Sequence, residues 1–431
     1  LSNKPSRFTS INTKNCIHIC YNLVFQIPYT ILTMLKKKIL LGVTGSIAAY
    51  KTADLIRQLR QNDYFVQVIM TKSAKEFITP LTLQALSGNP VLENMWDPSE
   101  GNGMAHINLS RNTDLILIAP SSANFIAKLA NGNADDLLSN LCLARKCPLL
   151  VAPAMNVEMY DNQATQRNIN IIKKDGVLIS GPESGEHACG DHGMGRFINF
   201  ETLILDVEKS MVKNLFKGKN ILISSGATFE KIDEARVITN LSSGLMGLNL
   251  AKAAYKFGAE VTVIKGKSNY NFPSCIKTIE ADNHSQMQKI VNTKIVMSDI
   301  YISAAAISDY KPKPVYGKIK KKSKITIDLL KTEDILGTIG LKNKKTFLVG
   351  FAAESEDLEK NAKKKLVEKR LDMIVGNLIK ESMGKTSSKV AIIDKSGEIK
   401  LQVGTKTNLS LMILEHIFKI YSKEKENELI N

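Results

Sequence analysis

The chain has 431 residues, 44% of them hydrophobic, which is too long for one hydrophobic core and suits two domains of ordinary size. Its formal net charge of +16 attracts polyanions such as nucleic acid, anionic membranes or phosphorylated substrates, although a lysine-rich genomic bias would give the same charge. The six cysteines are widely scattered, which argues against a disulfide-dense secreted module and favours a reducing compartment, the cytoplasm.

Residues 1–33 differ from the rest because they contain no acidic residue, and positions 15–35 carry no formal charge. A membrane anchor would need such a stretch, but His18, Asn22 and Pro28 would be costly in hydrocarbon. Met34 stands directly before a basic segment and the first expected strand. We therefore expect residues 1–33 to be an extension absent from the native product, with a disordered tail or a targeting segment as alternatives.

From Met34 onward, apolar runs of strand length alternate with amphipathic stretches. We expect strands over 38–43, 65–70, 114–119, 149–153 and 176–180, and helices over 47–61 and 73–87. This alternation is typical of a parallel sheet covered by helices on both faces. Ligands of such sheets bind beyond the carboxyl ends of the strands, so the loops after the strands are the expected site.

Those loops carry glycine, hydroxyl and amide residues. The pattern Gly42-x-x-Gly45-Ser46 lacks the third glycine of the dinucleotide fingerprint, but it places a flexible backbone at a helix N-terminus, where one phosphate binds well. Each loop alone is equally compatible with an ordinary strand–helix turn. Together they predict a mononucleotide pocket, with the expected contacts Gly45, Ser46, Thr71, Ser122 and Asn124.

Six segments of this half resemble one family and follow its order. They are Gly-Ser-Ile-Ala-Ala-Tyr-Lys at 45–51, Phe-Ile-Thr-Pro-Leu at 77–81, Ala-His-Ile at 105–107, Pro-Ser-Ser-Ala-Asn at 120–124, Pro-Ala-Met-Asn-x-x-Met at 153–159 and Ala-Cys-Gly-Asp at 188–191. Residues 38–205 thus look like the flavin-dependent cysteine decarboxylases, in particular phosphopantothenoylcysteine decarboxylase. The resemblance implies a flavodoxin-like flavoprotein fold with FMN.

The resemblance assigns catalytic roles to three residues of this half. His106, an imidazole that titrates near neutral pH, would carry out acid–base work. Asn156 would hold the substrate carboxylate with an uncharged amide, so that CO2 can leave. Cys189 would return a proton when the enethiol intermediate is reduced, under a mobile glycine-rich flap at 184–195. A lone histidine more often helps packing and a cysteine is often a buried structural thiol, but their positions in the motifs favour catalysis.

After a short helical connector at 201–217, a second strand–helix series begins. We expect strands over 220–224, 260–264, 299–304, 346–351, 372–376 and 390–393, and helices over 247–257 and 355–369. The glycine- and serine-rich loop at 240–247 precedes a helix and suits a phosphate. The segment 311–324 holds seven lysines and two prolines, which predicts either a solvated loop or a loop that closes lysines over a triphosphate.

The second half resembles phosphopantothenate–cysteine ligase, fused behind the decarboxylase as in many bacteria. The segments concerned are Ile-Thr-Asn-Leu-Ser-Ser-Gly at 238–244, Ala-Ala-Ala-Ile-Ser-Asp-Tyr at 304–310, Lys-Ile-Lys-Lys at 318–321 and Gly-Phe-Ala-Ala-Glu at 350–354. The resemblance implies coupling of 4'-phosphopantothenate to cysteine through an acyl-cytidylate made from CTP with Mg2+. Asn240 would bind the acyl-cytidylate, and Lys318 would assist attack on CTP. The implied nucleotide contacts are Ser303, Ala305, Asp309, Lys318, Phe351, Lys365 and Lys369; no metal ligand is assigned.

The sequence also departs from the ligase pattern. Ala227, Phe229 and Lys231 stand where the family usually has proline, arginine and proline, and Lys389 stands where asparagine is common. None of these positions is assigned to catalysis. The substitutions bear on substrate affinity and on the loop near Gly226.

The sequence therefore predicts two doubly wound, Rossmann-like α/β domains with parallel sheets: a decarboxylase at 34–205 and a ligase at 219–425, joined by a linker at 206–218. The expected partners are the small-molecule substrates 4'-phosphopantothenate, cysteine and CTP, without nucleic acid or membrane. The resemblance implies a homo-oligomer, a dodecamer built from trimers of the flavin domain and dimers of the ligase domain.

Two other functions compete with this bifunctional enzyme of coenzyme A biosynthesis. One is a non-catalytic flavin-fold regulatory subunit. This alternative is disfavoured because the chain keeps the expected catalytic residues His106, Asn156, Cys189 and Lys318. The other is a decarboxylase that acts on peptide C-terminal cysteine, which the downstream ligase half disfavours.

Overall fold

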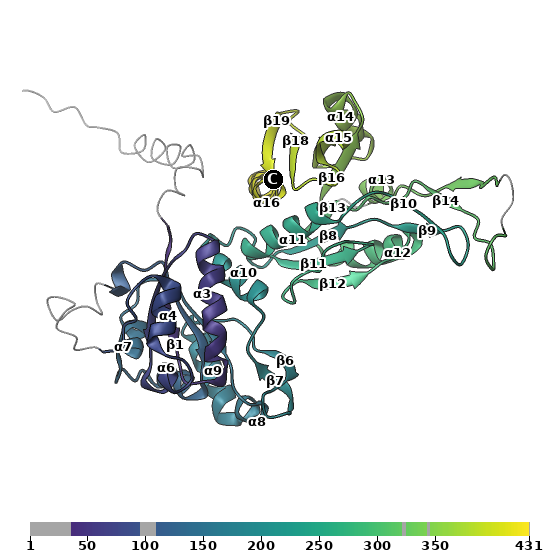
Figure 1. Cartoon of the computed structure of the whole chain (residues 1–431). Helices are drawn as coiled ribbons and strands as arrows, with labels where there is room; N and C mark the ends of the chain where they lie inside the picture. The colour runs from purple at the N-terminus through teal and green to yellow at the C-terminus, as the bar shows by residue number, and fades with distance from the viewer. Residues whose placement is uncertain (1–35, 95–108, 321–324, 343–344, 431) are drawn as a thin grey trace, which may run out of the picture. The chain divides into compact units, whose positions relative to one another are not determined.

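The computed structural model describes residues 36–94, 109–320, 325–342 and 345–430 (Figure 1). Its contacts divide the chain into two compact units that meet in sequence at Ile198 and Asn199. Residues 1–33 of the expected extension and His106 lie outside the described residues. Among the described residues, no helix is both long and apolar enough to cross a lipid bilayer.

The first unit, purple to blue in Figure 1, consists of strands separated by helices. Its elements are β1 (Lys38–Val43), η1 (Ile47–Lys51), α3 (Thr52–Gln61), β2 (Phe65–Met70), η2 (Lys72–Glu76), α4 (Pro80–Ser87), β3 (Leu115–Ser121), α6 (Ala123–Asn131), α7 (Leu137–Leu143), β4 (Leu149–Pro153), α8 (Val157–Asp161), α9 (Gln163–Lys174), β5 (Leu178–Ile179), β6 (Glu183–Glu186) and β7 (His192–Arg196).

Strands β1 to β5 form one parallel sheet in the order β2-β1-β3-β4-β5. This is the flavodoxin-like order, in which the ligand crevice opens beside β1 and β3. One face of the sheet packs Leu40, Ile116 and Val151 against apolar side chains of α6, α7 and α9. Because β1, β3 and β4 are covered on both faces, their residues form continuous apolar runs rather than an alternating pattern.

The helix expected over 73–87 is interrupted in the structure. A short 3-10 helix, η2, ends at Glu76, and α4 begins at Pro80 with Thr79 as its N-cap. The Thr79 hydroxyl accepts the backbone N–H of Thr82. Proline disfavours a helical residue before it but fits the first helical position, where no N–H is needed. Pro80 therefore starts a new helix instead of continuing the previous one.

The second unit is larger and carries a mixed sheet. Its elements are α10 (Phe200–Ser210), β8 (Asn220–Ser225), β9 (Phe229–Lys231), β10 (Val237–Thr239), α11 (Leu245–Lys256), β11 (Glu260–Lys265), β12 (Lys277–Glu280), α12 (His284–Lys294), η4 (Ile295–Met297), β13 (Ile300–Ser303), β14 (Tyr310–Pro312), β15 (Leu329–Lys331), α13 (Ile335–Lys342), β16 (Phe347–Glu354), α14 (Leu358–Glu368), β17 (Met373–Leu378), α15 (Ile379–Ser382), β18 (Ser387–Asp394), β19 (Ile399–Thr405) and α16 (Lys406–Ile430).

The main sheet of this unit has the order β12-β11-β8-β13-β16-β17-β18-β19. From β12 to β17 the strands are parallel, in the order of doubly wound dinucleotide-binding folds, and the order reverses between β8 and β13. The expected parallel arrangement is confirmed for these strands. The strand expected at 390–393 lies in β18, which runs antiparallel to β17 and pairs with β19.

Helices cover both faces of this sheet. On one face, Ile223, Val263 and Val349 pack against α11 and α16. On the other, Leu222, Ile264 and Leu348 pack against α12, α13 and α14. The alternation of neighbouring residues between two apolar layers is what a buried parallel sheet requires. Helix α10 contacts α11 of this unit, and the Tyr255 hydroxyl donates a hydrogen bond of 2.5 Å to the Asp206 carboxylate.

Candidate active sites

In the first unit, hydrogen bonds of hydroxyl side chains connect the segments at the carboxyl ends of β1, β3 and β4. The Thr44 hydroxyl donates to the Pro120 carbonyl at 2.9 Å and accepts the Ser122 N–H at 2.8 Å. The Ser46 hydroxyl donates to the Ala154 carbonyl at 3.0 Å. Three loops distant in sequence thus share one edge of the sheet, the carboxyl ends of the strands, where the sequence analysis expected the site.

The predicted flavin contacts lie directly after β1, β2 and β3, at or near the starts of the helices that follow these strands. Ser46 and Ser122 are the N-caps of η1 and α6, so their hydroxyls also accept backbone N–H groups of those helices. Asn124 is exposed in the first turn of α6. Gly45 lies so close to η2 that an added Cβ would sit 2.6 Å from Cβ of Ser73. The Thr71 N–H donates to the Val43 carbonyl at 3.0 Å.

Ser121, at the end of β3, was not predicted as a site residue. It is fully buried, and its hydroxyl has no hydrogen-bond partner among the described residues. Buried polar groups of native proteins normally have a partner. A buried hydroxyl without one, at the ligand edge of a flavodoxin-like sheet, fits a site completed by the polar groups of a bound molecule.

The β6–β7 hairpin brings Asn156 and Cys189 together. The Asn156 amide donates to the Asp191 carboxylate at 2.8 Å, and the Cys189 thiol donates to the same oxygen at 3.1 Å. The two predicted catalytic residues also lie side by side, with Nδ2 of Asn156 3.4 Å from Sγ of Cys189. The Cys189 and Asn156 hydrogen bonds hold the pKa of Asp191 below its usual value.

The hairpin is anchored to the loop after β4. The Met155 N–H donates to the Gly195 carbonyl at 3.0 Å. Gly195 has φ of +123°, and an added Cβ would lie 2.4 Å from the Met155 carbonyl oxygen, so only glycine fits there. This anchor keeps the exposed Cys189 beside Asn156. Asp191 belongs to the Ala-Cys-Gly-Asp segment, and that segment was the only sequence signal for it.

In the second unit, the loops after β8 and β13 meet where the strand order reverses. The Ala306 N–H donates to the Gly226 carbonyl at 2.8 Å, and the Thr228 N–H donates to the Ala306 carbonyl at 3.3 Å. Gly226 has φ of +86°, and an added Cβ would lie 2.6 Å from the Lys267 carbonyl oxygen. The backbone of this loop is therefore closely packed, as a phosphate-type turn at a parallel strand end requires.

Asn240 lies at this junction. Its amide donates to the carbonyls of Ala306 and Ile307 at 3.1 and 3.2 Å. The buried Thr228 hydroxyl accepts the Ser308 N–H at 2.9 Å, which fixes the segment that leads to Asp309. Ser303, Ala305 and Asp309 follow one another along this segment from the end of β13. Together with Asn240, these predicted residues form one cluster.

Two predicted lysines are each paired with a carboxylate: Lys365 of α14, and Lys369, which directly follows the end of that helix. Lys365 contacts Glu354 at 2.6 Å, and Lys369 contacts Asp334 at 2.8 Å. Burial acts to raise the pKa of Asp334, but the Lys369 ammonium and the Gly337 N–H outweigh it and hold that pKa low. Phe351, which lies on β16 together with Glu354, is half-buried.

Lys318 is exposed in the segment after β14. The neighbouring residue Ile319 donates its N–H to the Asp233 carboxylate at 3.1 Å, and its carbonyl accepts from Arg236 at 3.2 Å. Neither Asp233 nor Arg236 was predicted as a site residue, although Asp233 follows closely on the substituted positions Ala227, Phe229 and Lys231.

The substitution Ala227 changes the hydrogen bonding of the loop after β8. The Ala227 N–H donates to the Lys267 carbonyl at 2.9 Å, and the Lys267 N–H donates back to the Ala227 carbonyl at 2.8 Å. The proline that the family usually has there lacks the N–H and could not make the first bond. In this chain, the two backbone hydrogen bonds between Ala227 and Lys267 therefore hold the loop after β8 in place.

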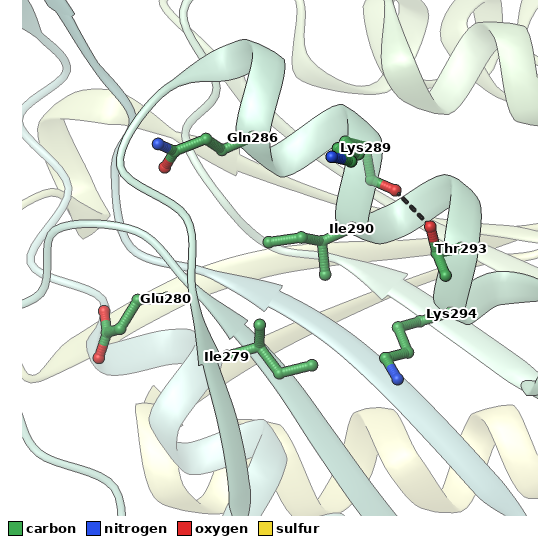
Figure 2. A pocket seen from close by; sticks show the side chains of 7 residues that line it. All are labelled: Ile279, Glu280, Gln286, Lys289, Ile290, Thr293 and Lys294. Atoms are coloured by element: carbon green, nitrogen blue, oxygen red, sulfur yellow. Dashed lines mark hydrogen bonds between the residues drawn. The ribbon is translucent and has the colours of Figure 1, made fainter.

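A pocket of about 440 Å3 lies elsewhere, between β12 and α12 (Figure 2). Figure 2 shows Ile279 and Ile290 facing each other across it, with Lys294 at one side. Strand β12 is at the edge of the sheet, separated from β8 by β11. The pocket contains none of the predicted site residues, and we do not assign the chemistry to it.

Two stretches of the sequence match family models. Residues 31–212 match the family described as Flavoprotein, and residues 216–421 match the DNA/pantothenate metabolism flavoprotein C-terminal domain. The fold and the two clusters thus define a two-domain α/β flavoprotein with a second, ligase-type domain.

The comparisons with individual proteins identify the family. The chain is 42% identical over 391 residues to a coenzyme A biosynthesis bifunctional protein CoaBC of Vibrio parahaemolyticus, covering 89% of this chain and 98% of the relative. The chain belongs to this CoaBC family. It is a bifunctional enzyme of coenzyme A biosynthesis, with a flavin-dependent phosphopantothenoylcysteine decarboxylase domain and a ligase domain.

Solved structures resemble each half separately. The crystal structure of the C-terminal domain of a CoaBC protein is 35% identical, covers 49% of this chain and all of its own chain, and has a TM-score of 0.44. The FMN-dependent cysteine decarboxylase SpaF is 32% identical, covers 39% of this chain and 93% of its own, and has a TM-score of 0.35.

Proposed function

We propose that the second unit couples 4'-phosphopantothenate to cysteine through an acyl-cytidylate made from CTP, and that the first unit then decarboxylates 4'-phosphopantothenoylcysteine to 4'-phosphopantetheine with FMN. The spans proposed are 34–205 for the decarboxylase and 219–425 for the ligase. The observation that carries the proposal is the contact of Asn156 and Cys189 on one carboxylate at the ligand edge of a flavodoxin-like sheet.

The hydroxyl-lined edge beside β1 and β3 fits FMN. The α6 N-terminus and the loop at Gly45 and Ser46 offer backbone N–H groups to a single phosphate, and the buried Ser121 hydroxyl lies at the same edge without a hydrogen-bond partner among the described residues. When bound, the flavin supplies an electron sink for oxidation of the cysteine thiol, which makes loss of CO2 easy.

The residues of the first unit then have distinct tasks. Asn156 orients the substrate carboxylate without a positive charge that would hold the carboxylate in place. Cys189 delivers a proton from its thiol at Sγ. Because the Asp191 carboxylate accepts from both side chains in this structure, a substrate carboxylate that reaches Asn156 competes with Asp191. His106, which lies outside the described residues, is proposed to exchange the proton that accompanies thiol oxidation.

In the second unit, we propose that Lys318 neutralises charge on the CTP phosphates and that Asn240 holds the acyl-cytidylate. Ser303, Ala305, Asp309, Phe351, Lys365 and Lys369 are proposed to line the nucleotide site. The described residues contain no cluster of three or more metal-ligating His, Cys, Asp or Glu side chains. Mg2+ commonly binds through substrate phosphates with few protein ligands, so we propose that it enters with CTP.

We further propose that the enzyme acts in the cytoplasm as a homo-oligomer, with trimers of the flavin unit and dimers of the ligase unit forming a dodecamer. The four described cysteines are free thiols, as a reducing compartment would leave them. Large apolar side chains such as Leu81 and Leu241, exposed by 74% and 81%, fit subunit contacts. Sedimentation of the purified chain tests the assembly.

An assay of both half-activities tests the proposed function. The full chain is incubated with 4'-phosphopantothenate, cysteine and each nucleoside triphosphate in turn, while pyrophosphate and CO2 are measured separately. His106→Asn is expected to stop CO2 release and to spare ligation, whereas Lys318→Gln is expected to slow pyrophosphate formation from CTP. Loss of both activities in His106→Asn would contradict the division of labour. A folded chain without flavin absorbance that FMN cannot restore would contradict the first-unit site.

A further inference from the structure

Asp233 is a buried carboxylate in the turn 232–236 between β9 and β10, with 2% of its surface exposed. A buried carboxylate is costly unless it is paired or hydrogen-bonded. Oδ1 of Asp233 accepts the Ala235 N–H at 2.8 Å, and Oδ2 accepts the Ile319 N–H at 3.1 Å. The Arg236 guanidinium lies 3.5 Å from Oδ2. Oδ1 therefore binds within the turn, whereas Oδ2 contacts both the turn and a distant segment.

That distant segment is the lysine-rich one. Both polar backbone groups of Ile319 are bound by the turn, the N–H by Asp233 and the carbonyl by Arg236 at 3.2 Å. A second link lies a few residues earlier, where the Val315 N–H donates to the Ile232 carbonyl at 3.0 Å. The side chains on either side of Ile319, Lys318 and Lys320, are exposed. The backbone is thus fixed while the ammonium groups are left accessible.

The charge of Asp233 fits this task. Burial acts to raise its pKa, but the N–H groups of Ala235 and Ile319 and the Arg236 guanidinium outweigh burial and hold the pKa below its usual value. The carboxylate is therefore ionised at neutral pH, and hydrogen bonds to an ionised acceptor are stronger than those between neutral groups.

We propose that Asp233 is a positioning residue of the ligase reaction, which fixes the peptide of Ile319 and thereby places Lys318 for its interaction with the CTP phosphates. The proposal rests on the role of Lys318 in the proposed function. A lysine in an unanchored segment must be ordered when the nucleotide binds, whereas an anchored one is pre-organised. Asp233 itself is not proposed to touch a substrate.

The test measures pyrophosphate formation by the full chain from CTP and 4'-phosphopantothenate. The variants are Asp233→Asn, Lys318→Gln, the double variant, and Glu234→Gln as a matched control, because Glu234 is an exposed carboxylate in the same turn. We expect Asp233→Asn to lower the rate about ten- to a hundredfold, the loss that follows removal of one hydrogen bond to a charged group. Glu234→Gln should retain the rate of the unmodified chain.

The double variant separates positioning from general support of the fold. If Asp233 acts through Lys318, Asp233→Asn has little further effect once Lys318 is already Gln, because the two changes remove one interaction. Effects that multiply in the double variant would overturn the proposal. If Lys318→Gln alone leaves the rate unchanged, the proposed role of Lys318 is wrong. Failure of the Lys318 role is thereby distinguished from failure of the positioning role of Asp233.

A second pair of variants leaves Asp233 intact in case Asp233→Asn does not fold. Ile319→Pro removes the N–H that Asp233 accepts, and Ile319→Ala keeps it. We expect the proline variant to lose pyrophosphate formation and to be cleaved faster by trypsin after Lys320, since trypsin does not cleave a Lys–Pro bond, with Ile319→Ala close to the unmodified chain in both respects. Equal rates and equal cleavage in the two variants would overturn the proposal.

Discussion

Thr228→Val tests the idea that one buried hydroxyl holds the ligase site together. Thr228 is fully buried. Its Oγ1 accepts the Ser308 N–H at 2.9 Å, and its carbonyl accepts the Thr239 hydroxyl at 2.9 Å. Valine has nearly the same shape but no acceptor at this position. The substitution therefore leaves the N–H of the buried Ser308 unsatisfied, while the packing around residue 228 is preserved.

The expected cost follows from that one group. A buried donor without an acceptor destabilises a protein by about 1–3 kcal/mol. For a unit of this size, each kcal/mol lowers the unfolding temperature by about 2–4 °C, so the ligase unit should unfold roughly 2–12 °C lower. Ligation should fall further than stability alone implies, because the displaced segment carries Asp309 and the carbonyls of Ala306 and Ile307 that Asn240 binds.

Calorimetry of the full chain and separate measurements of pyrophosphate and CO2 check this prediction. Thr228→Ser is the matched control, since it loses only a methyl group, at about 0.5–1.5 kcal/mol, and keeps the acceptor. We expect Thr228→Ser to ligate normally and Thr228→Val to ligate poorly, with CO2 release from supplied 4'-phosphopantothenoylcysteine unchanged in both. Normal ligation by Thr228→Val, or an equal loss of CO2 release, would refute the reasoning.

Three further predictions concern the hairpin, the thiol and pH. Gly195→Ala should destabilise the flavin unit more than Gly176→Ala, because both residues have positive φ but only Gly195 has a backbone oxygen within 2.4 Å of the added Cβ; equal unfolding temperatures would contradict this. Cys189→Ser should release CO2 but accumulate the enethiol, detected by mass spectrometry, and normal 4'-phosphopantetheine yield would argue against its role as proton donor. Burial and the Lys400 ammonium lower the pKa of His416, so below about pH 6.5 the unfolded chain binds more protons than the folded unit and stability falls on acidification. His416→Gln should reduce that fall between pH 7 and 5, and an unchanged slope in denaturant titrations would contradict it.

Much of the candidate site was predictable because its residues lie in recognisable local segments. Asn156 and Cys189 each belong to a motif at a strand end or a hairpin, and Asn240 belongs to a loop before a helix. The shared carboxylate of Asp191 was not predicted, although it stands in the quoted Ala-Cys-Gly-Asp segment. Its partner Asn156 lies 35 positions away, and no local pattern states which of two distant side chains will meet.

The residues that hold the sites in place were the ones missed. Thr44, Thr228 and Asp233 bond mainly to backbone groups of segments about 76 to 86 positions away. A threonine or aspartate beside a turn is common for local reasons such as capping, so its type carries little information about a distant partner. Only the pairing of loops in space distinguishes these residues from ordinary turn residues.

The sequence by itself determined that the chain forms two α/β units with parallel strands, because apolar runs and amphipathic stretches are local properties of the chain. It also predicted that the chemistry lies at strand ends. The tertiary structure decided the strand orders, the antiparallel pairing of β18 with β17 and β19, and the break before Pro80 that separates η2 from α4. These features depend on which distant backbone groups pair and which apolar faces are buried together, and such choices are settled only when the whole core is assembled.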